Sequence, residues 1–452
     1  AANLRMSVNL AHHGVISLSR APPYLPTMYR EPLPVIVSAG TVQIVDYVLG
    51  QASDETYFSG QYAKAIKYQN VGWLLLLAAG VLVAARRLSG SLVLALLAVG
   101  LLVVKIPATP TSLAALGIDT LETDLPAAAL LLWGSIYFSR AIANGRGAHF
   151  FYAGLFFGAL ALTKAAFFYI FFGVLGSAWL LGTVLRERTT PPWGRMPSKL
   201  LLLAAGCAIL TLPWMARNMI QLDTFSIAQR GGLVLLFRAE KNLMTAEEYR
   251  GTFYIWAPEK LRPLMGRLLG YTHADVQRGG RLQHIYRDKD SDHFESDLAA
   301  ELAGRPDLAL SYYHRVRAER IKLENQLGRS PEAMRSIDQQ LQTRAVSLIK
   351  THPFRHIGTV VPFLWRGAPT TFPILLLALI LALARRNREV AAFALPAFGL
   401  VMFYALFSHF TPRYSVPAVG VTLVVLLWLF ASVLRWMRGR PSAARGATGA
   451  AA

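Results

Sequence analysis

Residues 416–434 read VPAVGVTLVVLLWLFASVL, an uncharged apolar stretch with Arg413 before it and Arg435 after it. About 20 apolar residues in a helix cross the hydrocarbon core of a bilayer, so this stretch is long enough to be a membrane span. Eight similar stretches precede it, and the shorter ones must extend into their flanking loops or tilt little. We expect spans at 72–85, 91–104, 125–139, 148–162, 165–185, 200–214, 371–384, 390–408 and 416–434.

The composition supports an integral membrane protein independently. Hydrophobic residues make up 54% of the 452 residues and charged residues 16%, with a mean hydropathy of +0.38. Soluble domains carry fewer apolar and more charged residues. We therefore predict an all-α, multi-span helical bundle.

The distribution of the basic residues predicts the topology. The net charge is +20, and the arginines cluster in every second loop between the apolar stretches, while the intervening loops hold isolated cations such as Lys105. Arginine-rich loops face the cytoplasm, so the intervening loops face outward. Binding to nucleic acid would require basic and aromatic residues gathered on one soluble face, and it is not expected. The cytoplasmic set is Arg86, Arg87, Arg140, Arg146, Arg186, Arg188, Arg195, Lys199, Arg385, Arg386, Arg388, Arg435, Arg438, Arg440 and Arg445.

This topology divides the chain into five regions. Residues 1–71 form an outer-face segment, whose apolar run 35–49 is expected to lie along the membrane surface. Residues 72–215 form a transmembrane block, 216–370 an outer-face helical domain, 371–436 the last spans, and 437–452 a disordered cytoplasmic tail. Because the chain starts outside without a membrane anchor, we expect a first span to be missing. The single cysteine, Cys207, lies within a span and excludes an intrachain disulfide.

Two helices are expected within the outer domain. Ser330-Pro331-Glu332 resembles a helix start, with serine at the N-cap and proline at the first helical position. Apolar residues then recur at helical spacing until Thr351, and 307–327 is expected to be a partner helix. The apolar face comprises Met334, Ile337, Leu341, Ala345 and Leu348.

Two patterns resemble metal sites only weakly. Asp288, Asp290 and Asp292 are spaced like the start of a calcium loop, but His293 and Ala299 stand where glycine and glutamate are needed. A solvated acidic loop explains them better. The adjacent pair His12-His13 is equally weak, because neighbouring side chains on a helix point apart.

Glu122 and Asp124 are the strongest chemical signal, because two carboxylates stand at the mouth of the span 125–139. An acid at the edge of an apolar span is costly to desolvate, so it usually has a partner or a wet cavity. The alternative is structural: Asp124 precedes Leu125-Pro126 and could cap the helix. Capping and catalysis are compatible.

Three cations are expected at the same outer boundary, namely Lys164, Arg217 and Arg413. Their outer position departs from the positive-inside pattern. Three such cations around two carboxylates suggest a site for an anionic ligand such as a phosphate. The alternative for any one of them is that it snorkels to lipid headgroups.

Ordered motifs along the chain resemble those of the GT-C glycosyltransferases, and most closely the branch of protein O-mannosyltransferases and aminoarabinose transferases. Each motif is short, so their order and their depth in the membrane carry the resemblance. The motifs are Asn9-Leu10-Ala11, Tyr29-Arg30-Glu31-Pro32-Leu33-Pro34, Glu122-Thr123-Asp124-Leu125-Pro126, Ala161-Leu162-Thr163-Lys164, Pro213-Trp214-Met215-Ala216-Arg217-Asn218 and Pro412-Arg413-Tyr414-Ser415-Val416-Pro417.

The resemblance implies an inverting enzyme of the bacterial inner membrane, with its active site facing the periplasm. Such an enzyme passes a sugar from a polyprenyl-phosphate donor to a lipid, glycan or protein acceptor. It implies catalytic roles for Asp124 and Glu122, and it places the family's main acid about two residues before Ala1. Some relatives use a divalent metal, and the sequence leaves metal use open. The implied substrate-binding residues are Tyr29, Arg30, Lys164, Arg217, Asn218, Arg413 and Tyr414.

Two other classes of protein remain open on the sequence. A transporter or lipid flippase would show internal repeats and helices broken at mid-membrane, and neither is clear here. A non-catalytic membrane scaffold is favoured if the start of the protein lacks an acid.

Overall fold

The computed structural model describes residues 2–104, 113–183, 196–229, 231–277, 279–285, 299–300, 302–305, 311–328 and 330–438. Within these ranges every regular element is a helix, and an isolated bridge joins Ser17 to Pro26. The predicted all-α class is confirmed, and the described parts of all nine predicted apolar stretches are largely helical.

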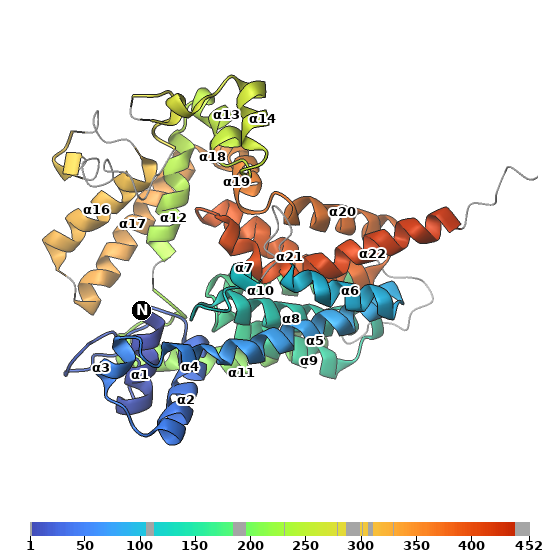
Figure 1. Ribbon diagram of the computed structural model, residues 1–452, viewed down its shortest axis with the longest axis horizontal. Coiled ribbons are helices and arrows are strands. Elements are labelled where there is room, and N and C mark those ends of the chain that lie inside the picture. The colour runs from blue at the N-terminus through green and yellow to red at the C-terminus, as the bar shows by residue number, and fades with distance from the viewer. Residues whose placement is uncertain are drawn as a thin grey trace, which may run out of the picture.

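The apolar helices lie side by side in one bundle (Figure 1). Most of α8 is buried in the bundle core, and its first residue is Asp124. The helices of the bundle are α5 (Gln69–Ser89), α6 (Leu92–Val103), α8 (Asp124–Asn144), α9 (Gly147–Ala161), α10 (Ala166–Thr183), α11 (Met196–Leu222), α20 (Thr371–Ala384), α21 (Arg388–Phe407) and α22 (Val419–Arg438).

Among the described residues, 6 helices are long and apolar enough to cross a membrane, or 7 if a bent pair counts as one span. Five of these candidate spans contain α5, α8, α11, α21 and α22 and coincide with predicted spans. The apolar helices α6, α9 and α10 are shorter. The sixth is α2 (Pro32–Leu49), which the sequence analysis placed along the membrane surface. In Figure 1, α2 runs across the direction of α5 at one end of the bundle, the orientation expected of a surface helix.

Arginines of the predicted cytoplasmic set lie together at one end of the bundle. At this end Arg87 pairs with Glu389 at 2.7 Å, and Arg435 donates to the carbonyl of Ser89 at 3.5 Å. Figure 1 shows the N-terminal block (residues 2–68) and the outer domain (residues 231–367) together at the opposite end. Both were predicted to share one side of the membrane. Of the predicted basic set, Arg186, Arg188, Arg195, Arg440 and Arg445 lie outside the described residues, as does Lys105.

Backbone contact between α9 and α11 requires glycine. A Cβ added at Gly154 would collide with the carbonyl of Leu203, and one added at Gly206 would collide with the carbonyl of Phe151. Small residues allow this close approach, which is typical of membrane helix pairs.

The N-terminal block consists of α1 (Ala2–His13), α2, α3 (Asp54–Phe58) and α4 (Ala63–Lys67) around a small apolar core. His12 links three of these helices, because its Nδ1 lies 2.5 Å from Asp54 and its Nε2 lies 2.9 Å from Asp46. Both ring nitrogens of His12 are therefore occupied by carboxylates.

The outer domain confirms the predicted helix at Ser330, whose hydroxyl accepts a hydrogen bond from the amide of Ala333 at 3.2 Å. That helix, α17 (Pro331–Thr351), buries Ile337 and Leu341 against α12 (Gly231–Ala239). The predicted partner is α16 (Tyr312–Leu327), while 307–310 lie outside the described residues. Other helices described in this domain are α13 (Ala246–Ile255), α14 (Arg262–Leu269), α18 (Pro353–Gly358), α19 (Val360–Gly367) and the short 3-10 helices η1 (Glu240–Leu243) and η2 (His273–Val276).

Candidate functional site

The carboxylate of Asp124 lies between two cations at the end of the bundle that carries the N-terminal block and the outer domain. Lys164 donates to Oδ1 at 2.6 Å, and Nε of Arg413 donates to Oδ2 at 2.5 Å. The side chain of Asp124 is only 3% exposed. A buried carboxylate needs such partners, because an uncompensated charge away from water is very unfavourable.

Three segments distant in the sequence meet here. Asp124 begins α8, Lys164 lies in the turn between α9 and α10, and Arg413 lies in η3 (Pro412–Ala418), the 3-10 helix before α22. The amide of Lys164 donates to the carbonyl of Leu160 at 2.9 Å, which fixes the turn. The bundle therefore brings together two of the three cations that the sequence analysis grouped.

The interpretation of Asp124 as a simple helix cap is wrong. Thr123 is the N-cap residue of α8 and makes no side-chain cap hydrogen bond. Both carboxylate oxygens of Asp124 bond to cations instead. The dipole at the start of α8 still favours a negative charge at this position.

Glu122 adds a second carboxylate to the cluster, with Oε2 lying 2.8 Å from a terminal nitrogen of Arg413. Burial raises the pKa of Glu122 and outweighs the opposing effect of Arg413, so the pKa lies above its ordinary value of 4.5. With Glu122 ionised the cluster has two cations and two anions; once Glu122 is protonated the cluster carries a net positive charge. Arg413 is 52% exposed, so its guanidinium can also contact a ligand.

Aromatic and polar side chains surround the cluster. The ring of Tyr414 lies 5.7 Å from Nζ of Lys164 and stacks on the ring of Tyr404 at 4.7 Å. The hydroxyl of Tyr414 lies 3.5 Å from Nε2 of His409. Tyr414 was predicted from its motif, whereas Tyr404 and His409 were not, because a single tyrosine or histidine near an apolar span carries no distinctive pattern.

Glu31 is a further neighbour that the sequence analysis did not assign. Its Oε1 accepts a hydrogen bond from the amide of Ala165 at 3.0 Å, next to Lys164 in the chain. The amide of Leu33 also donates to the carbonyl of Leu162 at 3.0 Å. The motif at 29–34 therefore packs against the turn that carries Lys164. Glu31 lies within this motif, and the motif is the sequence feature from which its place near the site could have been predicted.

Arg217 and Asn218 make a different set of contacts. A terminal nitrogen of Arg217 donates to the carbonyl of Thr27 at 3.3 Å and to Oδ1 of Asn218 at 2.9 Å. Its guanidinium lies 4.8 Å from the ring of Trp214. Asn218 is fully buried and donates to the carbonyl of Ser226 at 2.8 Å. These contacts tie the end of α11 to the N-terminal block and to the following turn.

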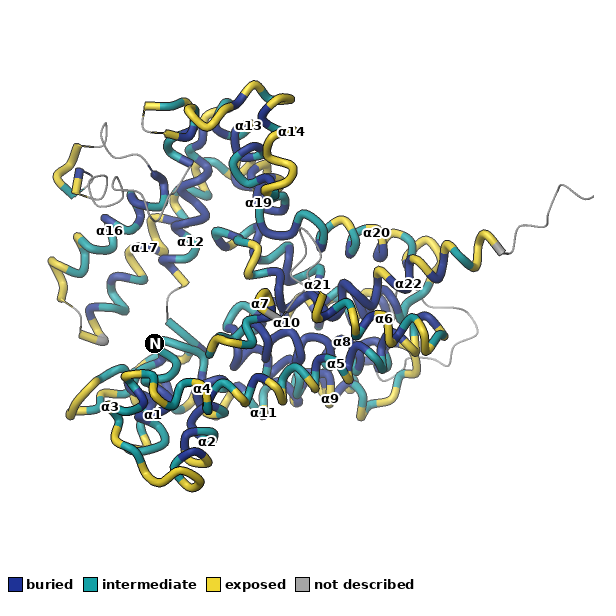
Figure 2. Tube along the Cα trace, viewed as in Figure 1, coloured by how far each residue is buried: buried dark blue, intermediate teal, exposed yellow. Residues whose placement is uncertain are grey.

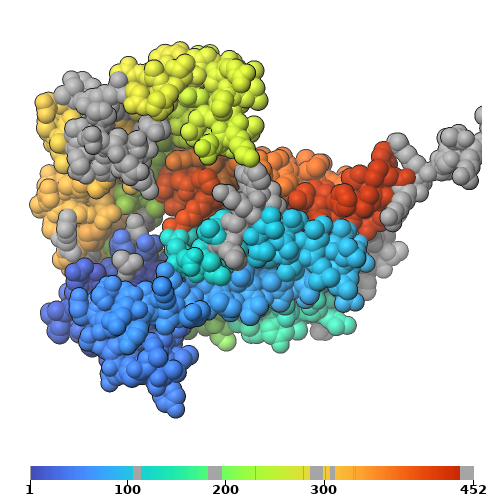
Figure 3. Space-filling view, in the orientation of Figure 1, coloured from blue at the N-terminus to red at the C-terminus, as the bar shows by residue number. Residues whose placement is uncertain are grey.

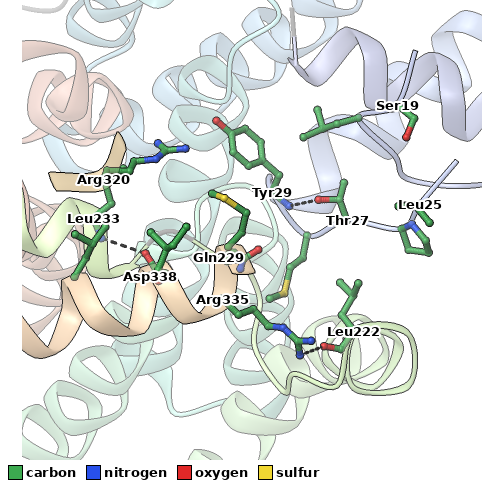
Figure 4. Close-up of a pocket in the computed structure, with 16 residues that line it drawn as sticks. Ser19, Leu25, Thr27, Tyr29, Leu222, Gln229, Leu233, Arg320, Arg335 and Asp338 are labelled. Atoms are coloured by element: carbon green, nitrogen blue, oxygen red, sulfur yellow. Dashed lines mark hydrogen bonds between the residues drawn. The ribbon is translucent and has the colours of Figure 1, made fainter. Parts of the chain in front are cut away.

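Tyr29 and Arg30 lie close together, with the guanidinium 5.6 Å from the tyrosine ring. Tyr29 also lines a cavity of about 240 Å³ between the N-terminal block, the end of α11 and the outer domain (Figure 4). Two charged side chains of its lining bond to backbone groups: Asp338 accepts from the amide of Leu233, and Arg335 donates to the carbonyl of Leu222. The lining includes no member of the Asp124 cluster, which is therefore a separate feature.

Metal ligands are not grouped in the described part of the chain, where no set of three or more His, Cys, Asp or Glu could hold an ion. The calcium-like residues Asp288, Asp290, Asp292 and His293 lie outside the described residues. Both ring nitrogens of His12 are already bonded to carboxylates.

The chain matches no protein-family model, no curated protein and no solved structure. The resemblance to GT-C glycosyltransferases therefore depends on the order of the sequence motifs.

Proposed function

We propose that this protein is a GT-C-like membrane glycosyltransferase that takes a sugar from a polyprenyl-phosphate donor. The observation that carries the proposal is the buried Asp124 held by Lys164 and Arg413. The positive-inside rule assigns the arginine-rich end to the cytoplasm, so this cluster faces the outside of the inner membrane. An amphiphilic donor with its phosphate at that interface suits a cation whose guanidinium is half exposed.

Arg413 is the residue that would contact the donor phosphate. Breaking the bond between the sugar and the phosphate leaves negative charge on the departing polyprenyl phosphate. A guanidinium fixed beside that oxygen stabilises the transition state more than the ground state. Arg413 is held on one side by Asp124 and can exchange Glu122 for phosphate on the other. Lys164 adds positive charge behind it.

Glu122 and Asp124 would have different roles. Glu122 is 39% exposed and has a raised pKa, so it suits a group that accepts a proton from the acceptor hydroxyl. The hydroxyl oxygen then bonds to the anomeric carbon, while the carbon–phosphate oxygen bond breaks and its electron pair leaves with the phosphate. This single displacement inverts the anomeric centre. Asp124 is buried between two cations, which suits a positioning residue.

The test is sugar release from labelled donors in proteoliposomes. Purified protein is mixed with polyprenyl-phosphate mannose, glucose or aminoarabinose and a membrane extract that supplies acceptors. We expect one labelled sugar to leave the lipid-phosphate fraction and to enter an acceptor. Movement of intact donor across the bilayer, with no cleavage, would instead indicate a flippase. Donor binding without cleavage or movement would indicate a scaffold.

A further inference from the structure

Two short helices of the outer domain expose apolar side chains at helical spacing. Phe354 and Ile357 of α18 are 86% and 63% exposed, and Val361 of α19 continues the same i, i+3, i+7 pattern. Leu264 and Leu268 of α14 are also exposed. Figure 2 shows exposed residues along α14, and Figure 1 places α14, α18 and α19 at one corner of the molecule. These three helices all contact α13, and we call the five exposed side chains the apolar docking face.

The docking face is held firmly on the protein. Tyr249 of α13 donates to the carbonyl of Gly358, and Trp365 of α19 donates to the carbonyl of Phe253 at 3.1 Å. Below the exposed stripe, Phe363 is buried against Trp256, with ring centroids 5.3 Å apart. These contacts fix α18 and α19 to α13, the helix that also packs on α14. The exposed residues are therefore presented by a packed structure.

A sharp bend separates α18 and α19 from the next helix of the bundle. The segment Pro353–Gly367 is bent by 111° from α20, which is the next helix of the bundle. If α20 follows the bilayer normal, α18 and α19 run close to the membrane plane. α20 itself exposes Leu377 and Ile380, which are residues of a lipid-facing surface. Figure 3 shows the yellow-green α13–α14 segment beside the orange and red helices, at the same edge of the bundle.

The residues around the docking face are mainly basic. Lys350 and Arg355 are exposed next to Phe354, and Arg262 and Arg267 are exposed on α14. An amphipathic surface with apolar residues in the middle and cations at its margin is typical of a segment that binds anionic headgroups and inserts into the acyl boundary. A soluble partner protein would have no need to share an edge with the lipid-facing surface of α20.

We propose that the apolar docking face rests on the outer leaflet of the bilayer, so that the outer domain is anchored to lipid through α14, α18 and α19. Phe354, Ile357, Leu264 and Leu268 insert at the level of the acyl boundary, and Arg355, Lys350, Arg262 and Arg267 contact phosphate headgroups. This anchoring fixes the height of the outer domain over the end of α8. It does not depend on the proposed sugar transfer.

The test uses nitroxide labels on the full-length protein in nanodiscs of phosphatidylcholine and phosphatidylglycerol. Cys207 is the single cysteine and is buried, so new cysteines should take up the label selectively. Wild-type protein carried through the same labelling reaction measures any background from Cys207. The labelled variants are Phe354→Cys and Leu268→Cys, with Leu377→Cys as the lipid control. Leu327→Cys, at an exposed position of α16 in the same domain, is the aqueous control. These positions are exposed, so labelling should not disturb folding.

The readout is collision of the label with oxygen, which partitions into lipid, relative to a water-soluble nickel chelate. We expect positions 354 and 268 to favour oxygen, as position 377 does, and position 327 to favour the chelate. Positions 354 and 268 that behave like 327 would overturn the proposal. Protection of these two labels from both reagents would also overturn it, because it would indicate a protein partner.

Discussion

Nε of Arg413 lies 2.5 Å from Oδ2 of Asp124, although 289 residues separate the two in the sequence. This contact joins the start of α8 to the 3-10 helix before α22. Lys164 completes the cluster from the turn before α10. The buried carboxylate therefore holds three parts of the membrane bundle together and fixes the direction of the Arg413 side chain.

Replacing Asp124 with asparagine should destabilise the protein by about 3–5 kcal/mol, the cost of removing one partner from a buried ion pair. Asparagine keeps the size of the side chain, and Thr123 remains the N-cap residue of α8, so loss of charge is the main change. The measurement is unfolding of detergent-solubilised Asp124→Asn protein, followed by intrinsic fluorescence. A stability equal to wild type would show that the pair contributes nothing.

The double variant Asp124→Asn with Lys164→Met separates stability from function. In Asp124→Asn both Lys164 and Arg413 lose the carboxylate of Asp124. The Lys164→Met change removes one of these two unpaired cations, so part of the lost stability should return. Sugar release should stay low, because Arg413 is still not held in place. Recovery of both properties would show that Asp124 acts on stability alone.

The N-terminal block should be most stable at mildly acidic pH. Burial lowers the pKa of His12, but the hydrogen bonds that its ring donates to Asp54 and Asp46 raise it above its ordinary value of 6.5. This stabilisation is complete below pH 6.5 and is lost as the pH rises through the raised pKa. Burial raises the pKa of Asp54, but the hydrogen bonds that Asp54 accepts from His13 and His12 lower it below its ordinary value of 3.8. The stabilisation that ionised Asp54 provides is therefore lost as the pH falls through this lowered pKa.

Hydrogen exchange of α1 and α3, corrected for intrinsic rates, checks this prediction. Protection should be greater at pH 5 than at pH 8 in the wild-type protein. His12→Gln should remove the difference. Equal protection at the two pH values in wild type would contradict the role of His12.

Lys241 should make the outer domain less stable at neutral than at alkaline pH. Burial lowers its pKa from 10.5 to about 7, with a further contribution from Arg366. Between these values the unfolded chain binds the proton more tightly than the folded chain, so stability rises with pH, by up to about 4 kcal/mol. Thermal unfolding at pH 7 and pH 9.5 should show this rise in wild type and not in Lys241→Met. Lys350→Met, at an exposed lysine, should behave like wild type.

Alanine at Gly206 should weaken the contact of α9 with α11. The added methyl group meets a backbone carbonyl, which cannot move aside without separating the helices, and such overpacking costs about 1–3 kcal/mol. Gly173→Ala in α10 is the matched control, because its Cβ would meet nothing within 4 Å. Thermal unfolding in detergent should distinguish the two variants. Equal stabilities would indicate that α9 and α11 can separate freely.

Much of the fold could be predicted because apolar length and arginine placement are local properties of the chain. The positions of the bundle helices and the shared end of the two outer regions follow from them. The start of α17 follows from another local pattern, the N-cap serine Ser330 followed by Pro331. The position of α2 relative to the membrane could not be predicted as simply, because its length and apolarity suit a span as well as a surface helix. Its direction across α5 is set by tertiary contacts that no local pattern encodes.

The candidate site was harder to predict because its geometry depends on tertiary contacts. Charge placement identified Asp124, Lys164 and Arg413, but it did not reveal that both cations bond to the carboxylate. Arg217 was grouped with them because it also ends a span. Its contact with Thr27 depends on the N-terminal block folding back onto α11, which no local pattern encodes.

The most direct test of the central claim is the binding of undecaprenyl phosphate and undecaprenol to purified protein in detergent. The two lipids differ only in the phosphate, so their comparison isolates the proposed role of Arg413. We predict that wild type prefers the phosphate lipid, and that Arg413→Gln loses about 2–5 kcal/mol of that binding while undecaprenol is unaffected. Equal binding of both lipids by wild type, or an unchanged preference in Arg413→Gln, would contradict the proposed donor site.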